Sequence, residues 1–192
     1  MKKLVLASTS PYRAQQLRQL GVSFETASPV CDETPNERES ASQLVQRLST
    51  AKAQSVAKDH PNALIIGGDQ VAERDGRIIG KPGDRANAVA QLSSASGRSM
   101  MFYSGVCVHD TATSQTQVDK VTTQVQFRTL NGDTINRYID AENPIDCAGS
   151  FKSEGLGIAL FQSVGSDDPS ALMGLPLIRL VSMLGVFGFS VP

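Results

Sequence analysis

The segment that most constrains this chain is the apolar run at residues 63–69, whose sequence is Ala-Leu-Ile-Ile-Gly-Gly-Asp. A short, continuous apolar run that leads into glycines predicts a strand buried on both faces of a sheet. The run ends at Asp69, and side chains at the carboxyl end of a buried strand face the crevice where α/β folds bind ligands. Asp69 is therefore a candidate functional residue, although an acid after two glycines is also typical of a plain turn.

Strands and helices alternate along the first half of the chain. Residues 4–7 predict a strand, and residues 12–20 predict a helix. A capping box, Ser40-x-x-Gln43, precedes apolar residues at helical spacing. A long amphipathic helix is therefore expected to follow it and to reach about Lys58.

The second half combines β-rich runs with further helices. Residues 100–109 and 115–127 flank a polar turn and predict a hairpin. Residues 145–161 are glycine-rich and alternating, so we expect a loop followed by a strand there. An apolar helix over residues 176–184 is expected to stop at Gly185.

This order of elements predicts an α/β fold with a mixed sheet flanked by helices. A length of 192 residues suits a single domain over residues 1–192, with a deep cleft between two lobes as one possible arrangement. Hydrophobic residues make up 40% and charged residues 19%, which is typical of a globular chain. The net charge of -1 leaves no broad basic face for duplex DNA, so strong nucleic-acid binding is not expected.

The cysteines and the N-terminal segment bear on the location of the protein. Cys31, Cys107 and Cys147 lack C-x-x-C spacing, and their odd number argues against a disulfide framework or a zinc site. The apolar run at residues 4–7 is too short for a signal peptide or a membrane span. We therefore expect a cytoplasmic protein that does not bind a membrane.

Acidic and basic side chains stand near predicted element ends. The acidic pair Asp32 and Glu33 lies in a predicted loop, and hard cations such as Mg²⁺ take carboxylate oxygens from separate segments, so this pair and Asp69 are candidate ligands. A strand, a serine-rich turn and a helix over residues 4–20 can hold a phosphate on backbone N–H groups. Attack of water on a phosphoryl group, assisted by a metal and a base, is the simplest use of such groups.

Four basic residues provide the scatter of positive charge that a triphosphate needs. Each lies next to a glycine-rich, serine-rich or helix-start element: Arg13, Lys52, Lys81 and Lys152. Alternatively, each lysine is ordinary solvated surface.

Six segments, in order, resemble the Maf family of nucleotide pyrophosphatases, and the resemblance runs from about residue 4 to residue 184. The segments are residues 7–13 (Ala-Ser-Thr-Ser-Pro-Tyr-Arg), 32–34, 52–53, 68–70, 80–82 and 147–155. The resemblance implies a long central sheet with a deep cleft, similar to inosine triphosphate pyrophosphatases, and a homodimer. It also implies metal-dependent cleavage between the α- and β-phosphates of a nucleoside triphosphate, with release of diphosphate.

The resemblance also implies roles for individual residues. Asp69 would accept a proton from the attacking water, and Glu33 together with Asp69 would hold Mg²⁺ or Mn²⁺. The residues implied to contact the phosphates are Ser8, Arg13, Lys52 and Lys81.

Three positions distinguish the groups within the family. Here they are Tyr12, Gln70 and Glu154, whereas the dTTP and UTP group has Arg, Thr and Gln at these places. The chain is more similar to the 7-methyl-GTP group, although that group has Trp where this chain has Tyr12. N7-methylation makes guanine cationic, and a cationic ring favours an aromatic face and a nearby carboxylate.

Other readings remain open. Residues 150–155 resemble a substrate-binding loop but also suit a glycine-rich turn, and Lys152 is assigned only to the neighbourhood of the cleft. A dTTP or UTP pyrophosphatase is the alternative in the same class. A nucleic-acid-binding inhibitor of cell division without turnover is the alternative in another class, and an aromatic content of 5% gives it little support.

Overall fold

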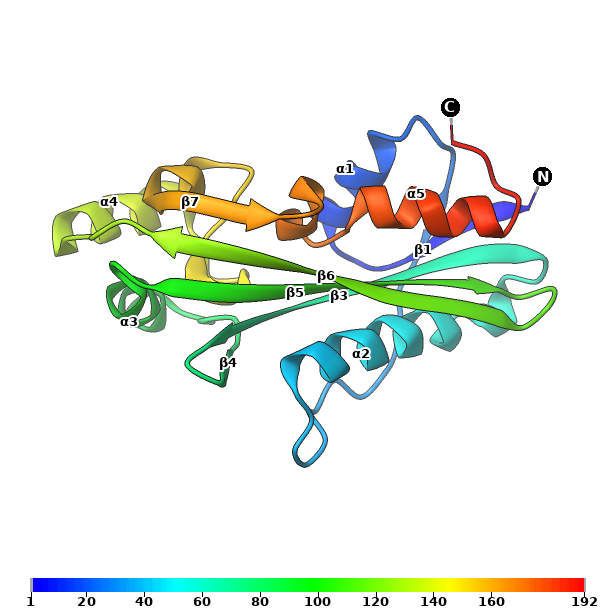
Figure 1. Ribbon diagram of the computed structural model, residues 1–192, viewed down its shortest axis with the longest axis horizontal. Helices are drawn as coiled ribbons and strands as arrows, with labels where there is room; N and C mark the ends of the chain where they lie inside the picture. The colour runs from blue at the N-terminus through cyan, green and yellow to red at the C-terminus, as the bar shows by residue number, and fades with distance from the viewer. Residues whose placement is uncertain (1, 192) are drawn as a thin grey trace. The chain divides into compact units, whose positions relative to one another are not determined.

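The computed structural model describes residues 2–191. Its helices are α1 (Pro11–Arg18), α2 (Ala41–Ser55), α3 (Arg85–Ala95), α4 (Gly132–Glu142) and α5 (Leu177–Val186). Its strands are β1 (Lys3–Ala7), β2 (Glu25–Ala27), β3 (Ala63–Arg74), β4 (Arg77–Ile79), β5 (Ser99–Asp110), β6 (Gln115–Phe127) and β7 (Phe161–Ser166). Both sets are drawn in Figure 1.

The strands form one mixed sheet in the order β2-β1-β3-β5-β6-β7, and β4 pairs with the last part of β3. β1 is parallel to β2 and β3, whereas β3 with β4 and β6 with β7 are antiparallel. The predicted α/β fold with a mixed, helix-flanked sheet is confirmed.

Residue contacts divide the chain into two compact units. The first comprises residues 2–70, 104–121 and 168–191, and the second comprises residues 71–103 and 122–167. The predicted domain, residues 1–192, also includes two terminal residues that lie outside the described range. Each unit is described separately below.

In the first unit, helices cover both faces of the strands. Leu4 and Leu6 of β1 pack in a buried cluster with residues of α1 and α5, and the intervening Val5 packs on the opposite face with Ala53 of α2. Figure 1 shows α1 and α5 on one side of β1 and β3, and α2 on the other. Because successive strand side chains point to opposite faces, this alternation makes a doubly buried strand.

Side chains at the helix starts fix where the helices begin. Ser40 and Gln43 form both hydrogen bonds of the predicted capping box at α2. The other caps that accept a hydrogen bond from a first-turn backbone N–H are Ser10, Asp84 and Asn131. α2 ends at Ser55 rather than near Lys58, because the chain tightens into a 3-10 helix at Ala57–Asp59.

A cluster of aromatic rings forms part of the core of the second unit. Four rings meet edge to face, with centroids 4.8 to 5.8 Å apart: Phe102, Phe127, Phe151 and Phe161. The prediction of a strand within residues 145–161 was wrong, since Gly149 and Ser150 have positive φ angles of 76° and 61° and β7 begins only at Phe161. Phe151, one of the alternating apolar residues, packs in the aromatic cluster from a segment that is not a strand.

The predicted stop of the last helix at Gly185 was also wrong. α5 continues to Val186, and the residue in the left-handed conformation is Gly188, with a φ of 73°. The backbone N–H of Phe189 then donates to the carbonyl of Leu184. Gly188 therefore ends the helix in the way that Gly185 was expected to.

Candidate active site

The turn between β1 and α1 brings a buried serine next to the amino end of a helix. Ser8 is buried directly after β1, and its Oγ accepts a hydrogen bond from the backbone N–H of Ser10 at 3.1 Å. Ser10 caps α1 through the backbone N–H of Arg13, and Pro11 occupies the first turn. The amino end of a helix favours negative charge, so this turn can receive a phosphate.

Arg13 is held across this turn by two contacts. Its Nε donates to the carbonyl of Gly174 at 2.9 Å, and one terminal nitrogen donates to the Ser8 Oγ at 3.4 Å. Burial lowers the pKa of the guanidinium, and the negative charges of Asp69 and Glu33 oppose that shift. An arginine remains charged under such conditions, so the site contains a partly desolvated cation.

Lys52 joins two carboxylates from separate segments. Its Nζ lies 2.6 Å from Asp69 Oδ1 and 2.7 Å from Glu33 Oε1. Lys52 and Asp69 are only 7% and 8% exposed, whereas the Glu33 side chain is 63% exposed. Burial disfavours the charge on Lys52, but the attraction and hydrogen bonds of Asp69 and Glu33 outweigh it, so the pKa of the ammonium is raised.

The strand register explains why these groups meet. β1 and β3 are parallel with Ala7 opposite Gly67, so Ser8 and Asp69 lie close to the same level of the sheet. Asp69 does not end its strand as predicted, because β3 continues to Arg74. The shorter neighbour β1 ends at Ala7, and the next residue, Ser8, is buried like Asp69.

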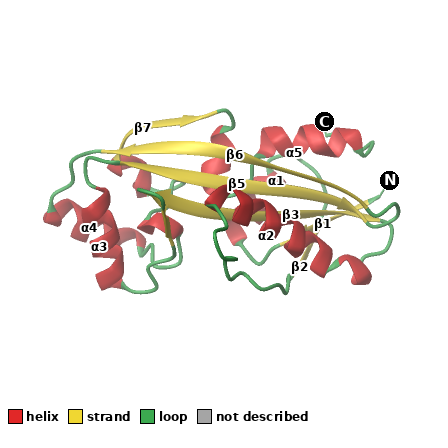
Figure 2. Cartoon of the chain, turned by 60° about the horizontal axis from the view of Figure 1, so that its bottom comes forward, coloured by secondary structure: helices red, strands yellow, loops and turns green. Residues whose placement is uncertain are grey.

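Two glycines bring α2 close to the strands. A side chain at Gly67 would meet the backbone of α2 at Ser49 and Ala53, and a Cβ at Gly105 would lie 2.6 Å from the carbonyl oxygen of Val45. Figure 2 shows α2 lying along β3 and β5, which carry these glycines. The close approach places Lys52, on the buried face of α2, beside Asp69.

Gln70 is held by the protein itself. Its Nε2 donates to Ser104 Oγ at 3.0 Å and to the carbonyls of Ala171 and Leu172 at 3.1 and 2.9 Å. These carbonyls belong to the 3-10 helix Pro169–Met173, close in the chain to the Gly174 carbonyl that binds Arg13. This segment could not be predicted from the sequence, because it acts through backbone carbonyls, which no residue type reveals.

The remaining predicted residues are distributed over both units. Tyr12 is half-buried in α1 of the first unit, whereas Lys81 and Glu154 are exposed in loops of the second. Lys152, also in the second unit, donates through Nζ to the carbonyl of Glu142 at 2.7 Å, and its backbone N–H donates to the hydroxyl of Tyr138. Lys152 thus ties the loop that carries Glu154 to the end of α4.

The carboxylates around Lys52 suit a cation but do not enclose one. Within residues 2–191, no group of three or more His, Cys, Asp or Glu side chains could hold a metal ion. Glu33 and Asp69 already share one positive charge, the Lys52 ammonium, between them. Mg²⁺ commonly binds through one or two carboxylates together with substrate phosphates and water, and this donor set fits that pattern.

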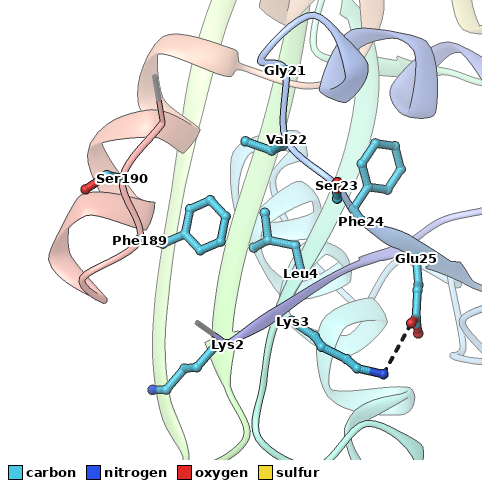
Figure 3. A pocket seen from close by; sticks show the side chains of 10 residues that line it. All are labelled: Lys2, Lys3, Leu4, Gly21, Val22, Ser23, Phe24, Glu25, Phe189 and Ser190. Carbon is cyan, nitrogen blue, oxygen red and sulfur yellow. Dashed lines mark hydrogen bonds and ion pairs between the residues drawn. The ribbon is translucent and has the colours of Figure 1, made fainter.

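A cavity of about 490 Å³ lies at the other end of β1, away from Ser8. Figure 3 shows Leu4, Val22, Phe24 and Phe189 around it, with Lys3 paired to Glu25 at 3.4 Å. Lys2, also at its rim, pairs with Asp110. The predicted site residues do not line this cavity, so it is separate from the polar groups around Asp69.

The fold and the site define an α/β protein with a cluster of charged side chains beside the end of a parallel strand. A solved HAM1 protein from Coxiella burnetii has the same fold, with a TM-score of 0.55 at 15% identity, covering 97% of this chain and 100% of that chain. In the described residues, no helix is long and apolar enough to cross a membrane.

The chain belongs to the Maf family, because the family model described as Maf-like protein matches residues 3–187 of the sequence. A relative in Vibrio parahaemolyticus, named 7-methyl-GTP pyrophosphatase, is 51% identical over 189 residues, which cover 98% of this chain and 97% of the relative. A relative in Pseudomonas aeruginosa with the same name is 49% identical over 192 residues, covering all of both chains.

Proposed function

We propose that this protein hydrolyses 7-methyl-GTP to 7-methyl-GMP and diphosphate, and so removes a modified nucleotide from the cell. The observation that carries the proposal is the contact of Lys52 with both Asp69 and Glu33, beside the Ser8 and Arg13 turn. Relatives of about half identity over the full length are named for this activity.

The basic residues bind the triphosphate in this proposal. Ser8, Arg13 and the first turn of α1 form one set of donors, in a partly buried setting where charged hydrogen bonds are strong. Lys52 adds a cation at Asp69. Lys81, in a loop of the second unit, is proposed as a further phosphate contact.

Asp69 is the proposed proton acceptor. Its carboxylate takes a proton from a water molecule as the water oxygen forms a bond to the α-phosphorus. The bond from that phosphorus to the bridging oxygen breaks, and diphosphate leaves with the bonding electrons. Lys52, held on Asp69 at 2.6 Å, keeps the carboxylate oriented before the nucleotide binds.

Glu33 and Asp69 are the proposed ligands of a divalent cation, Mg²⁺ or Mn²⁺. Such a cation, when bound, neutralises charge on the phosphate oxygens. Since the protein contributes two carboxylates, the nucleotide itself supplies further oxygens. Before the cation binds, Lys52 offsets part of the negative charge of these two carboxylates.

Tyr12, Gln70 and Glu154 are the proposed specificity residues. Tyr12 offers an aromatic face and Glu154 an exposed carboxylate for a cationic base. Gln70 already binds Ser104 and two backbone carbonyls, so its part in this proposal is to shape the wall of the site.

A nucleotide panel tests the substrate. With Mg²⁺ or Mn²⁺ present, we expect release of diphosphate from 7-methyl-GTP to exceed that from GTP, dTTP, UTP, CTP and ITP. The cationic base gains cation–π and carboxylate contacts that neutral bases lack. Faster turnover of dTTP or UTP would preserve the chemistry and overturn the specificity. DNA binding with no turnover would favour the cell-division inhibitor.

Removal of the cation is expected to stop the reaction. A chelator should abolish diphosphate release, and added Mg²⁺ or Mn²⁺ should restore it, because the phosphate charge is otherwise incompletely neutralised. Titration of Mn²⁺ followed by electron paramagnetic resonance should show weak binding to the protein alone and tighter binding with a non-hydrolysable nucleotide. Full activity after chelation would refute the proposed cation.

A cytoplasmic homodimer completes the proposal. Cys31, Cys107 and Cys147 are free thiols, which agrees with a reducing compartment. The dimer is proposed from the family resemblance, and light scattering on the purified protein measures it directly.

A further inference from the structure

Glu33 lies in a long loop whose position depends on contacts with the rest of the protein. From residue 28 to residue 40 the chain forms neither helix nor strand, and Glu33 is exposed. Loops are more mobile than the elements they connect, so a carboxylate on such a loop keeps its contact with a buried lysine better when the backbone around it is held. The fixing contacts come from the neighbouring helix α2.

Arg47, in the second turn of α2, reaches the backbone on both sides of Glu33. One terminal nitrogen donates to the carbonyl of Asp32 at 3.4 Å, and the other donates to the carbonyl of Thr34 at 2.9 Å. Glu33 lies between these two residues. The guanidinium therefore holds the carbonyl of the residue before Glu33 and the carbonyl of the residue after it.

Glu39 orients the Arg47 guanidinium. Nε of Arg47 lies 2.7 Å from Glu39 Oε1, and a terminal nitrogen lies 2.9 Å from Oε2, so the pair is bidentate. The Glu39 side chain is only 9% exposed. The hydrogen bonds from Arg47, and next the backbone N–H of Asn36, lower the pKa of Glu39 to about 2, so the carboxylate is ionised at neutral pH.

We propose that Arg47 is a positioning residue that holds the Glu33 carboxylate at Lys52 and Asp69, ready for the divalent cation that enters with the nucleotide. This inference rests on the proposed function. An arginine is needed because its planar fork serves Glu39 and two carbonyls at once, whereas the ammonium of lysine is a single point charge.

The test compares Arg47→Met and Arg47→Lys with Arg137→Met, which removes an exposed arginine from α4. We expect both Arg47 variants to need about 10-fold more Mn²⁺ for half-maximal hydrolysis, as for loss of groups that orient metal ligands. In a Glu33→Gln background, Arg47→Met should add little, because the two changes remove the same contact. Arg137→Met should behave as the wild type.

Hydrogen exchange followed by mass spectrometry gives a readout that does not depend on activity. Arg47→Met should speed amide exchange at residues 30–39 and leave the amides of β3 unchanged. Unchanged exchange at residues 30–39 overturns the inference. An unaltered Mn²⁺ requirement in the Arg47 variants overturns it too. So does a double variant in which the effects of Arg47→Met and Glu33→Gln on the Mn²⁺ requirement multiply in full. Faster exchange in β3 as well would show a general role in stability and also overturn it. If the wild type hydrolyses no nucleotide, the proposed function fails, and the exchange result alone judges Arg47.

Discussion

Replacing Asp69 with asparagine is expected to slow 7-methyl-GTP hydrolysis by about 1,000-fold, within the range for loss of a general base. Asparagine has nearly the same shape, and its amide oxygen can still accept the hydrogen bond that Lys52 donates at 2.6 Å. What is lost is the negative charge and the capacity to take a proton from water. The rate of 7-methyl-GTP hydrolysis should therefore fall strongly, whereas the free energy of unfolding should change little.

Asp75→Asn is the matched control for this experiment. Asp75 lies in the turn between β3 and β4, with a φ of 51° that asparagine also tolerates, and its nearest basic partners are 3.8 Å away. It should hydrolyse 7-methyl-GTP at the wild-type rate. Diphosphate release and nucleotide affinity are measured for both variants. Wild-type turnover by Asp69→Asn would show that another group accepts the proton.

The features predicted correctly from the sequence are those with local causes. The capping box at Ser40 and Gln43 acts within one turn of the chain, and α2 begins where the sequence indicated. The burial of β3 could also be predicted, because an apolar run such as residues 63–66 is stable only where it is shielded from water. Local hydrogen bonds and hydrophobicity are properties of the sequence itself.

Two errors show what the local sequence pattern leaves undecided. Residues 145–161 alternate like a strand, but Phe151 packs edge to face against Phe102 and Phe127, and the backbone turns to allow it. Gly185 looked like a helix stop, yet α5 continues to Val186 and Gly188 takes the left-handed conformation. The first error depends on contacts distant in the chain, and the second on a local choice between two glycines.

Only part of the candidate site could be predicted from the sequence, because some of its contacts come from segments that are distant in the chain. Asp69, Lys52 and Glu33 could be nominated by charge and position, and the structure brings them within 2.7 Å contacts around Lys52. The carbonyl of Gly174 and the fork of Arg47 could not be nominated, since one is backbone and the other is an ordinary helical arginine. Their contribution depends on which segments fold next to each other.

Gly67 shows how packing and chemistry are connected in this protein. Replacing it with alanine is expected to destabilise the fold by about 2 kcal/mol, a typical effect of overpacking a tight core. The new Cβ would meet the carbonyl of Ser49 and lie 2.9 Å from the backbone nitrogen of Ala53. Both are main-chain atoms of α2, so the helix must move away from β3.

The movement should also reduce activity, because Lys52 lies next to Ala53 on the helix that is displaced. Urea unfolding measures the loss of stability, and diphosphate release well below the unfolding midpoint measures the loss of rate in folded protein. Gly165→Ala is the control, since Gly165 in β7 has no heavy atom within 4 Å of an added Cβ. If Gly67→Ala matched this control in both measurements, the close approach of α2 would not be what places Lys52 on Asp69. A loss of both stability and rate would show that one glycine sets the packing distance on which the charge arrangement depends.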